Sequence, residues 1–166
     1  LSYEVVTAGT TYQELNVSVG TTASSVLNTT FLSGLTNIYY NAAYTPTTGL
    51  NTITFTTPFI WDGTSNLVIE FCWSNNNGGG TSTTVKYDNT TYAAQSYYRA
   101  DNQLPSVLCG TTTATATQTK RPMFTLNGTN ICSSPRVEVT ATVGASTPIT
   151  ISNDVTICNG AITSIQ

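Results

Sequence analysis

Apolar and polar residues alternate in short runs along this chain, and no run has the length and spacing of a substantial helix. The predicted strands are residues 2–7, 14–19, 36–41, 51–57, 67–74, 83–87, 96–100, 123–127 and 136–143. Gly, Asn and Pro separate them, as is typical of sandwiches and jelly rolls. Residues 23–35 predict a short helical turn at most, because Thr and Ser interrupt their apolar spacing. The pattern predicts an all-β protein with an antiparallel, jelly-roll-like β-sandwich.

Two strands of different character flank one turn in the middle of the chain. Residues 51–57 alternate apolar residues with Thr, which predicts a strand with one buried face. Residues 67–73 are almost continuously apolar, which predicts a central strand covered on both faces. Between them, we expect structural roles for Trp61, packed over the core edge, and for Asp62, which closes the turn with its side chain. A sugar-stacking role for Trp61 is the alternative.

Glu70 is the one charged residue within this apolar run. An unpaired buried carboxylate is costly, so Glu70 is expected to have a cationic partner. Arg99 and Arg121 are the candidates. We hypothesise a Glu70–Arg121 pair, since Arg121 stands at the start of a late strand.

Composition argues against catalysis. The 166 residues include no histidine, so the commonest general base and the commonest metal ligand are absent. A glycosidase-like mechanism needs two carboxylates held within about 5–10 Å of each other. Asp62, Asp88 and Asp101 all fall in predicted loops, and nothing in the pattern pairs them with Glu70. A hydrolase would need clustered carboxylates, and we expect a non-enzymatic protein.

Charge is sparse and slightly negative. Only 8% of the residues are charged and the net charge is -3, whereas an average soluble domain has about 25% charged residues. The cations are scattered: Lys86, Arg99, Lys120, Arg121 and Arg136. Binding to nucleic acid is therefore not expected. No apolar run approaches the roughly 20 residues of a membrane helix, so membrane insertion is not expected either.

The four cysteines indicate disulfide chemistry. None forms a C-x-x-C pair, and in a secreted β-protein disulfides are favoured over metal sites. The preferred pair is Cys72 with Cys109, which would link a central strand to a late loop. Cys132 is a competing partner for Cys109, and Cys158 would find its partner beyond Gln166. Free buried cysteines are the alternative.

Two turns carry oxygen-rich side chains suited to calcium. Asp88 and Asp101 each precede an asparagine, and Ca²⁺ favours carboxylate, amide and carbonyl oxygens. A structural calcium is the only cofactor that the sequence suggests. Solvated turn residues are the alternative interpretation of the same pattern.

Aromatic residues on the strands suggest a platform for carbohydrate. Neighbouring aromatics on a strand point to opposite faces, so one of each pair is available to solvent. Core packing and cross-strand pairs are the alternative roles. The candidate sugar-binding residues are Tyr40, Trp73, Tyr97 and Tyr98.

Several longer segments carry a family resemblance. They are FLSGLTNIYYNAAYTP (31–46), YTPTTGLNTITFTTPFIWDGTSNLVIEFCWSNN (44–76) and KRPMFTLNG (120–128). Together they resemble a β-sandwich module of large secreted proteins of the Bacteroidota, which are exported by the type IX system and include gliding and surface adhesins. The later CSSPRVEVTATV (132–143) and PITISNDVTICNGAITSI (148–165) resemble a linker and the first strands of an Ig-like repeat.

The resemblance implies a domain order and a location. We expect a jelly-roll-like module over residues 1–131, a strand and linker over 132–147, and the truncated start of an Ig-like domain over 148–166. Family members carry another strand region before the equivalent of Leu1, which implies that the first module lacks its N-terminal strands and that the natural chain begins upstream. An extracellular or cell-surface location is implied.

The expected function is that of a non-enzymatic module in a secreted or surface multidomain adhesin or filament, serving adhesion or acting as a structural spacer. Its expected partners are neighbouring domains of the same long chain and surface glycans. A carbohydrate-binding module of a secreted protein is the alternative.

Overall fold

The computed structural model describes residues 1–75 and 80–129. The chain divides into two compact units, Leu1–Leu126 and Asn127–Gln166. All the strands and the helix that are described belong to the first unit. The predicted strand at 136–143, the linker, the Ig-like segment, Cys132 and Cys158 lie outside the described residues.

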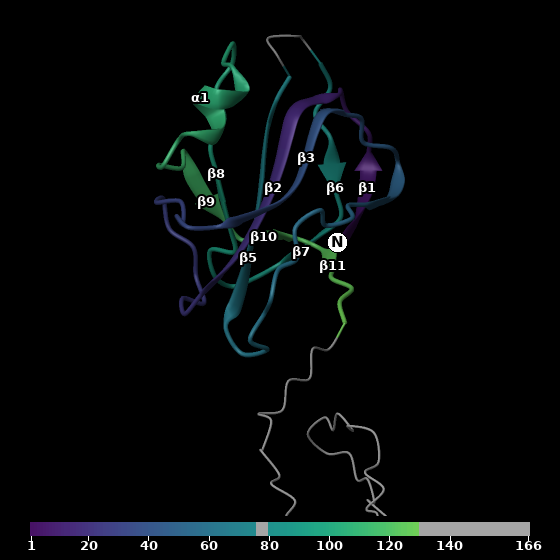
Figure 1. Ribbon diagram of the computed structural model, residues 1–166. Coiled ribbons are helices and arrows are strands. Elements are labelled where there is room, and N and C mark those ends of the chain that lie inside the picture. Colours follow the sequence, from purple (N-terminus) through teal and green to yellow (C-terminus); the bar gives the residue numbers. More distant parts are fainter. Residues whose placement is uncertain (76–79, 130–166) are drawn as a thin grey trace, which may run out of the picture. The chain divides into compact units, whose positions relative to one another are not determined.

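Nearly all the regular secondary structure described in this unit is β-strand, which confirms the all-β prediction (Figure 1). One short helix interrupts them, α1. In chain order the elements are β1 (Ser2–Thr7), β2 (Tyr12–Thr22), β3 (Thr36–Tyr44), β4 (Gly49–Thr52), β5 (Asn66–Ser74), β6 (Thr84–Val85), β7 (Tyr87–Asn89), β8 (Gln95–Tyr97), α1 (Pro105–Cys109), β9 (Ala116–Gln118), β10 (Lys120–Pro122) and β11 (Phe124–Thr125).

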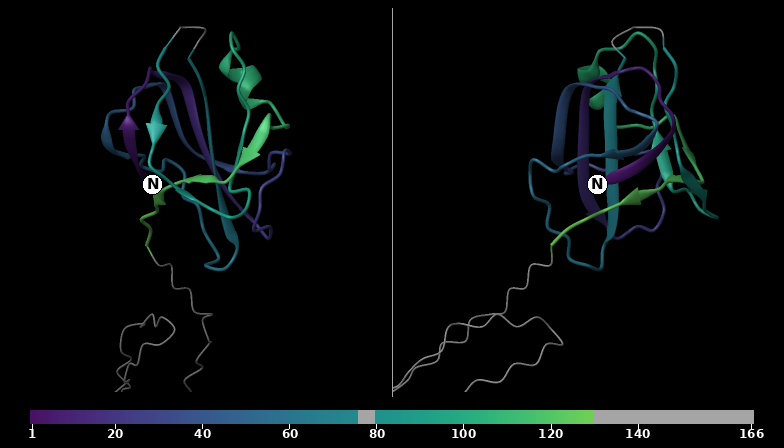
Figure 2. Two further views of the ribbon diagram at one scale, coloured as in Figure 1. Left: turned by 180° about the vertical axis from the view of Figure 1, so that it is seen from behind. Right: turned by 90° about the vertical axis from the view of Figure 1, so that its right-hand side faces the viewer.

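The strands form two larger antiparallel sheets and two small ribbons. One sheet has the order β3-β2-β5, and the other has the order β11-β1-β4 with β6 also paired to β1. The ribbons are β10-β7 and β8-β9. Two further views show β3, β2 and β5 standing together as one layer, with the short strands on its other side (Figure 2). The arrangement is an antiparallel β-sandwich.

The core lies between the faces of β1 and β2. Along β2, Leu15, Val17 and Val19 alternate with more exposed residues and are all at most 1% exposed. Tyr3 and Val5 of β1 belong to the same cluster. This period-two burial follows from the pleat, which sends successive side chains to opposite faces. The cluster is completed by Leu1, Ile38 and Ile53.

The predicted strand at 51–57 is wrong beyond its second residue. β4 ends at Thr52. The next residue, Ile53, donates its N–H to the carbonyl of Leu1, whereas the N–H of Thr56 bonds to the carbonyl of Ile38 in β3. The chain therefore crosses from one sheet to the other. Its apolar residues alternate because the crossing passes through the core.

The one described helix also lies elsewhere than the helical turn that the sequence predicted. Residues 23–35 form bends and one isolated bridge, whereas the helix spans Pro105–Cys109. Pro105 occupies its first turn, where the missing N–H breaks no helical hydrogen bond. Five residues are too few to show a helical apolar period, so the pattern gave no signal there.

A buried polar network joins the two sheets. The Tyr3 hydroxyl donates to the Tyr44 hydroxyl at 3.1 Å, which donates to Oδ1 of Asn51 at 3.1 Å. Asn51 is 5% exposed. Its amide nitrogen donates to the carbonyls of Thr47 and Gly49, and its Oδ1 also accepts the N–H of Thr47. One side chain thus satisfies the whole β3–β4 turn.

Replacing Asn51 with Ala should therefore destabilise the fold. The change leaves three turn groups without their partner and takes from the half-buried Tyr44 hydroxyl the acceptor of its proton, which costs about 2–3 kcal/mol of the unfolding free energy. Urea denaturation would measure it. Asn37→Ala is the matched control, because Asn37 makes only an exposed bond to Asn16 at 3.2 Å. Equal effects of the two changes would contradict the role given to Asn51.

Candidate functional site

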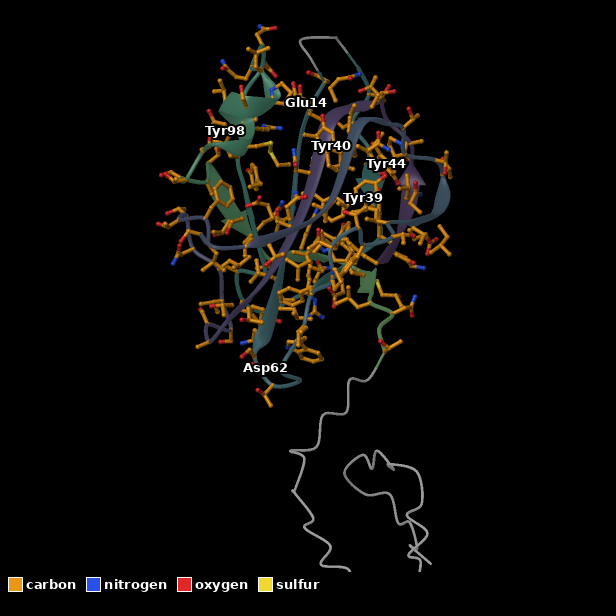
Figure 3. The ribbon with its side chains drawn as sticks, viewed as in Figure 1. Glu14, Tyr39, Tyr40, Tyr44, Asp62 and Tyr98 are labelled. Carbon is orange, nitrogen blue, oxygen red and sulfur yellow. A yellow bond between two sulfur atoms is a disulfide. The ribbon has the colours of Figure 1, made fainter. Side chains whose placement is uncertain are left out.

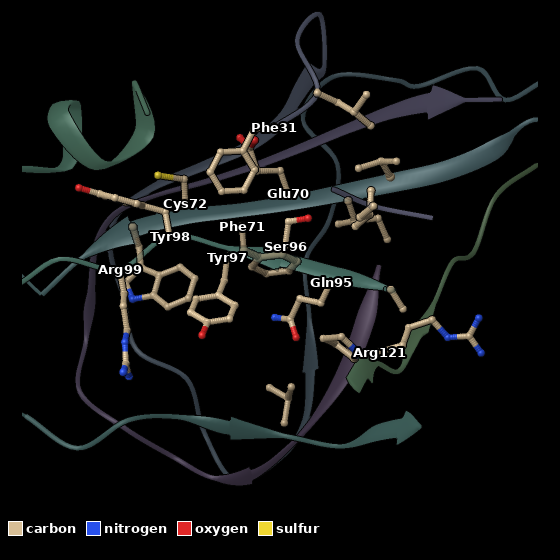
Figure 4. A pocket seen from close by; sticks show the side chains of 18 of the residues that line it. Phe31, Glu70, Phe71, Cys72, Gln95, Ser96, Tyr97, Tyr98, Arg99 and Arg121 are labelled. Carbon is tan, nitrogen blue, oxygen red and sulfur yellow. The ribbon is translucent and has the colours of Figure 1, made fainter. Parts of the chain in front are cut away.

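A cavity of about 1040 Å³ runs beside β5 (Figure 4). One wall consists of the consecutive residues 66–75, and the facing wall of the consecutive residues 92–101, which include β8. Phe31, from the loop between β2 and β3, also lines the cavity. Most of the side chains that line it are apolar or uncharged.

The cavity follows the edges of these two strands. A cavity over one face of a strand would touch alternate residues, since successive side chains point to opposite faces. This one touches every residue of both β5 and β8. β5 pairs with β2 alone and β8 with β9 alone among the strands that the structure describes. Each therefore presents an unpaired edge.

Among the described strands β5 is thus an edge strand, which differs from the central strand predicted from its sequence. Its residues from Leu67 to Cys72 are half-buried, neither fully covered nor fully exposed. The continuous apolar run nevertheless has a physical cause, since both faces are partly covered. Phe71 packs inward on Phe124, with ring centroids 5.6 Å apart, while Val68 and Glu70 lie on the opposite face.

A disulfide ties β5 to α1 across one end of the cavity. Cys72 and Cys109 are bonded, with their Cα atoms 5.6 Å apart. The preferred pairing from the sequence is therefore confirmed, and neither of these cysteines is free. The bond fixes the last helical residue against a strand whose ladder, among the described strands, is with β2 alone.

Breaking the disulfide should lower stability strongly. The bond spans a sequence separation of 37 residues, and the chain-entropy model gives about 3–4 kcal/mol for a loop of that size. We expect that loss in the unfolding free energy of the Cys72→Ser, Cys109→Ser double variant. Thermal unfolding with and without reductant would measure it. Wild-type protein in reductant should match the double variant, and a stability unaffected by reductant would contradict this.

The hypothesised Glu70–Arg121 pair is wrong. Arg121 instead pairs with Asp88 of β7, the residue opposite it in the β10-β7 ribbon. Its Nε lies 3.1 Å from Oδ1 of Asp88, a second guanidinium nitrogen bonds the other oxygen, and a third contacts the Tyr92 hydroxyl at 3.3 Å. Arg121 and Asp88 stand directly opposite each other on neighbouring strands, and such pairs interact. The sequence pattern did not reveal this register.

This pairing also changes the calcium hypothesis. Both carboxylate oxygens of Asp88 are engaged by Arg121, and this hydrogen bonding lowers the pKa of the Asp88 carboxyl. Asp101 belongs to the opposite wall of the cavity. Across residues 1–75 and 80–129, no three His, Cys, Asp or Glu side chains gather as a metal site. The structure thus gives Asp88 a protein cation as its partner.

Glu70 is half-buried and has no ion-pair partner among the described residues. Burial raises the pKa of its carboxyl above the ordinary value of 4.5. A raised pKa in the folded state means that folding is favoured when Glu70 is protonated. That contribution is present at acid pH and is lost as the pH rises through the folded-state pKa.

Glu70→Gln should therefore stabilise the protein at neutral pH. The gain is expected to be below about 1 kcal/mol, because the carboxylate is still partly hydrated. It should fade as the pH falls below the ordinary pKa of 4.5. Unfolding free energies of the variant and the wild type at pH 7 and pH 3.5 would measure the gain in stability and its loss at low pH. Glu14→Gln, at an exposed position on β2, is the control, and a gain at both pH values would contradict the assignment.

Three of the four predicted sugar-binding aromatics meet at this cavity. Trp73, Tyr97 and Tyr98 all line it. Trp73 is 38% exposed and stacks on Tyr12 with ring centroids 4.4 Å apart, which fixes the plane of the indole. Tyr40 does not line the cavity: it lies on β3, apart from Tyr98 (Figure 3).

Trp61 and Asp62 build the turn before β5. The Asp62 carboxylate accepts the backbone N–H groups of Thr64 and Ser65, each at 2.8 Å, and the Ser65 hydroxyl. These bonds, led by that of the hydroxyl, lower its pKa to about 2. Trp61 donates its indole N–H to the carbonyl of Ser65 at 2.8 Å and is 49% exposed. It closes the turn and does not cover the core edge as predicted.

Sequence reasoning missed the facing wall of the cavity. β8 was predicted, but its free edge was not, since strand order depends on pairing between distant segments. Phe31 gave no signal, because a single aromatic in a Thr- and Ser-rich loop has no periodicity.

Comparison with known proteins returns no significant match to a family model, to a curated protein or to a solved structure. Within the described part of the chain, no helix is long and apolar enough to cross a membrane.

Proposed function

We propose that this chain is a non-enzymatic module of a secreted or cell-surface multidomain protein, in which it serves adhesion or acts as a structural spacer. The Cys72–Cys109 disulfide is the observation that carries the proposal. Disulfides form and persist in oxidising compartments outside the cytosol. The resemblance to secreted surface modules of the Bacteroidota supports the same location.

The outer face of the β3-β2-β5 sheet supports a structural role. Asn16, opposite Tyr40 on β3, receives the amide of Asn37 and donates its own amide to the carbonyl of Glu14 at 2.9 Å. Uncharged side chains bonded in this way keep an exposed sheet hydrated without charge. A low-charge surface of this kind suits a module that stands beside many similar neighbours.

Carbohydrate binding is the second candidate, favoured by the aromatics at the cavity. Trp73, Tyr97 and Tyr98 offer ring faces of the kind that stack on sugars. The stack of Trp73 on Tyr12 holds its ring in place before any ligand arrives, which lowers the entropic cost of binding. Asp101 and Arg99 of the same wall would supply polar contacts.

A glycan array probed with the 166-residue chain separates the two functions. A sugar-binding module should bind defined glycans, and Trp73→Ala should weaken that binding at least tenfold while the matched Tyr40→Ala change leaves it intact. A spacer should bind none. The proposal as a whole expects no glycan to be cleaved, and released reducing ends would contradict it.

A further inference from the structure

The cavity is lined by every residue of both β5 and β8, on the side of each strand away from its ladder partner. We infer that this cavity takes an extended peptide strand, donated by another part of the same long polypeptide and hydrogen-bonded to the edges of both strands. The sheets β3-β2-β5 and β8-β9 would then become one continuous sheet with the new strand between β5 and β8. The source of the strand rests on the proposed multidomain function; the acceptor site does not.

The size of the cavity fits a single strand. Strands lie about 4.8 Å apart within a sheet, stacked layers lie about 10 Å apart, and each residue adds about 3.3 Å of length. One residue of an inserted strand therefore fills about 160 Å³. The cavity of about 1040 Å³ holds six or seven such residues, which is close to the length of β5.

Among the described residues, no backbone hydrogen bond links β8, or β5 between Leu67 and Trp73, to a strand on the cavity side. Between Leu67 and Trp73, β5 forms its ladder with β2 alone, and the ladder of β8 is with β9 alone, among the described strands. An extended peptide binds such an edge through its main chain, and side-chain pockets on alternate residues set its sequence preference. Apolar side chains would meet Ile69 and Phe71 on one face and Val68 on the other.

The shape of the cavity excludes a folded second copy. A dimer through the β5 edge would need an open edge that another sheet could approach. Here the segment 92–101 faces that edge across the cavity, so only a lone strand enters. An exposed apolar edge promotes aggregation, and a donor in the same polypeptide reaches millimolar effective concentration. A tethered strand would therefore outcompete free peptides.

Glu70 sets the charge of the donor. Its carboxylate lines the cavity, is half-buried and has no ion-pair partner among the described residues. Asp88 and Arg121 also line the cavity, but they neutralise each other. A donor strand with a basic residue on the face of Glu70 would supply the missing cation.

The acceptor site is tested with the 166-residue chain and two octapeptides. One is Thr-Val-Thr-Val-Lys-Val-Thr-Val; the other has Glu in place of Lys. Hydrogen exchange read by mass spectrometry should show that the amides within 67–72 and 95–97 that do not bond β2 or β9 are slowed about tenfold or more by saturating Lys peptide. Amides of β2 should not change. A shuffled peptide without alternation is the control. Unchanged exchange in β5 and β8 at saturating peptide would overturn the proposal.

Charge selection is tested in the same assay. The Lys peptide should bind about two- to fivefold more tightly than the Glu peptide, the range expected for a partly hydrated ion pair. Glu70→Gln should abolish this preference, and Glu14→Gln, at an exposed acid outside the cavity, should retain it. A preference that survives Glu70→Gln would remove Glu70 from the site.

The source of the strand is tested by dilution of the multidomain protein that the proposed function implies. Amides of β5 should exchange slowly there without added peptide, and equally so at all protein concentrations. Protection that is lost on dilution would identify a separate molecule as the donor and overturn the tethered source. None of these results depends on glycan binding, so failure here and failure of the proposed function are distinguishable.

Discussion

The way β5 is held determines much of this structure. Its hydrogen bonds come from β2 on one edge, and the opposite edge has no strand beside it among the described residues. Other contacts therefore fix it. The disulfide anchors Cys72 to α1, Phe71 stacks on Phe124, and Trp73 stacks on Tyr12. These contacts bind β5 to elements far apart in the chain, so the cavity beside it keeps a defined shape.

The core is independent of that edge. Leu15, Val17 and Val19 of β2 are buried against Tyr3 and Val5 of β1, and none of these contacts involves the free side of β5. The polar network around Asn51 adds a directional constraint that apolar packing lacks, since a buried network tolerates only the arrangement that satisfies it. The inward face of β5, with Leu67, Ile69 and Phe71, packs on this core, while its edge away from β2 takes no part in it.

Sequence analysis succeeded where the signal was local. β1 was predicted with its observed bounds, Ser2–Thr7, because strict alternation marks a half-buried strand. The Cys72–Cys109 pair followed from composition and compartment. Failures came from long-range pairing. Arg121 found Asp88 through the β10-β7 register, and register is not encoded in the period of either segment.

The apolar run of β5 predicted a central strand, and the reason for the difference is physical. Continuous apolar residues are typical of a strand covered on both faces and bonded on both edges, yet among the described strands β5 pairs with β2 alone. Natural proteins protect free edges with Lys, Pro, bulges or coverings. Between Leu67 and Trp73 the only charge is Glu70, and with 8% charged residues overall the chain has little charge for that purpose. The sequence of β5 is that of a central strand, and half-buried Glu70 is the single charge that it sets against pairing at its edge, so a covering strand would add the larger protection.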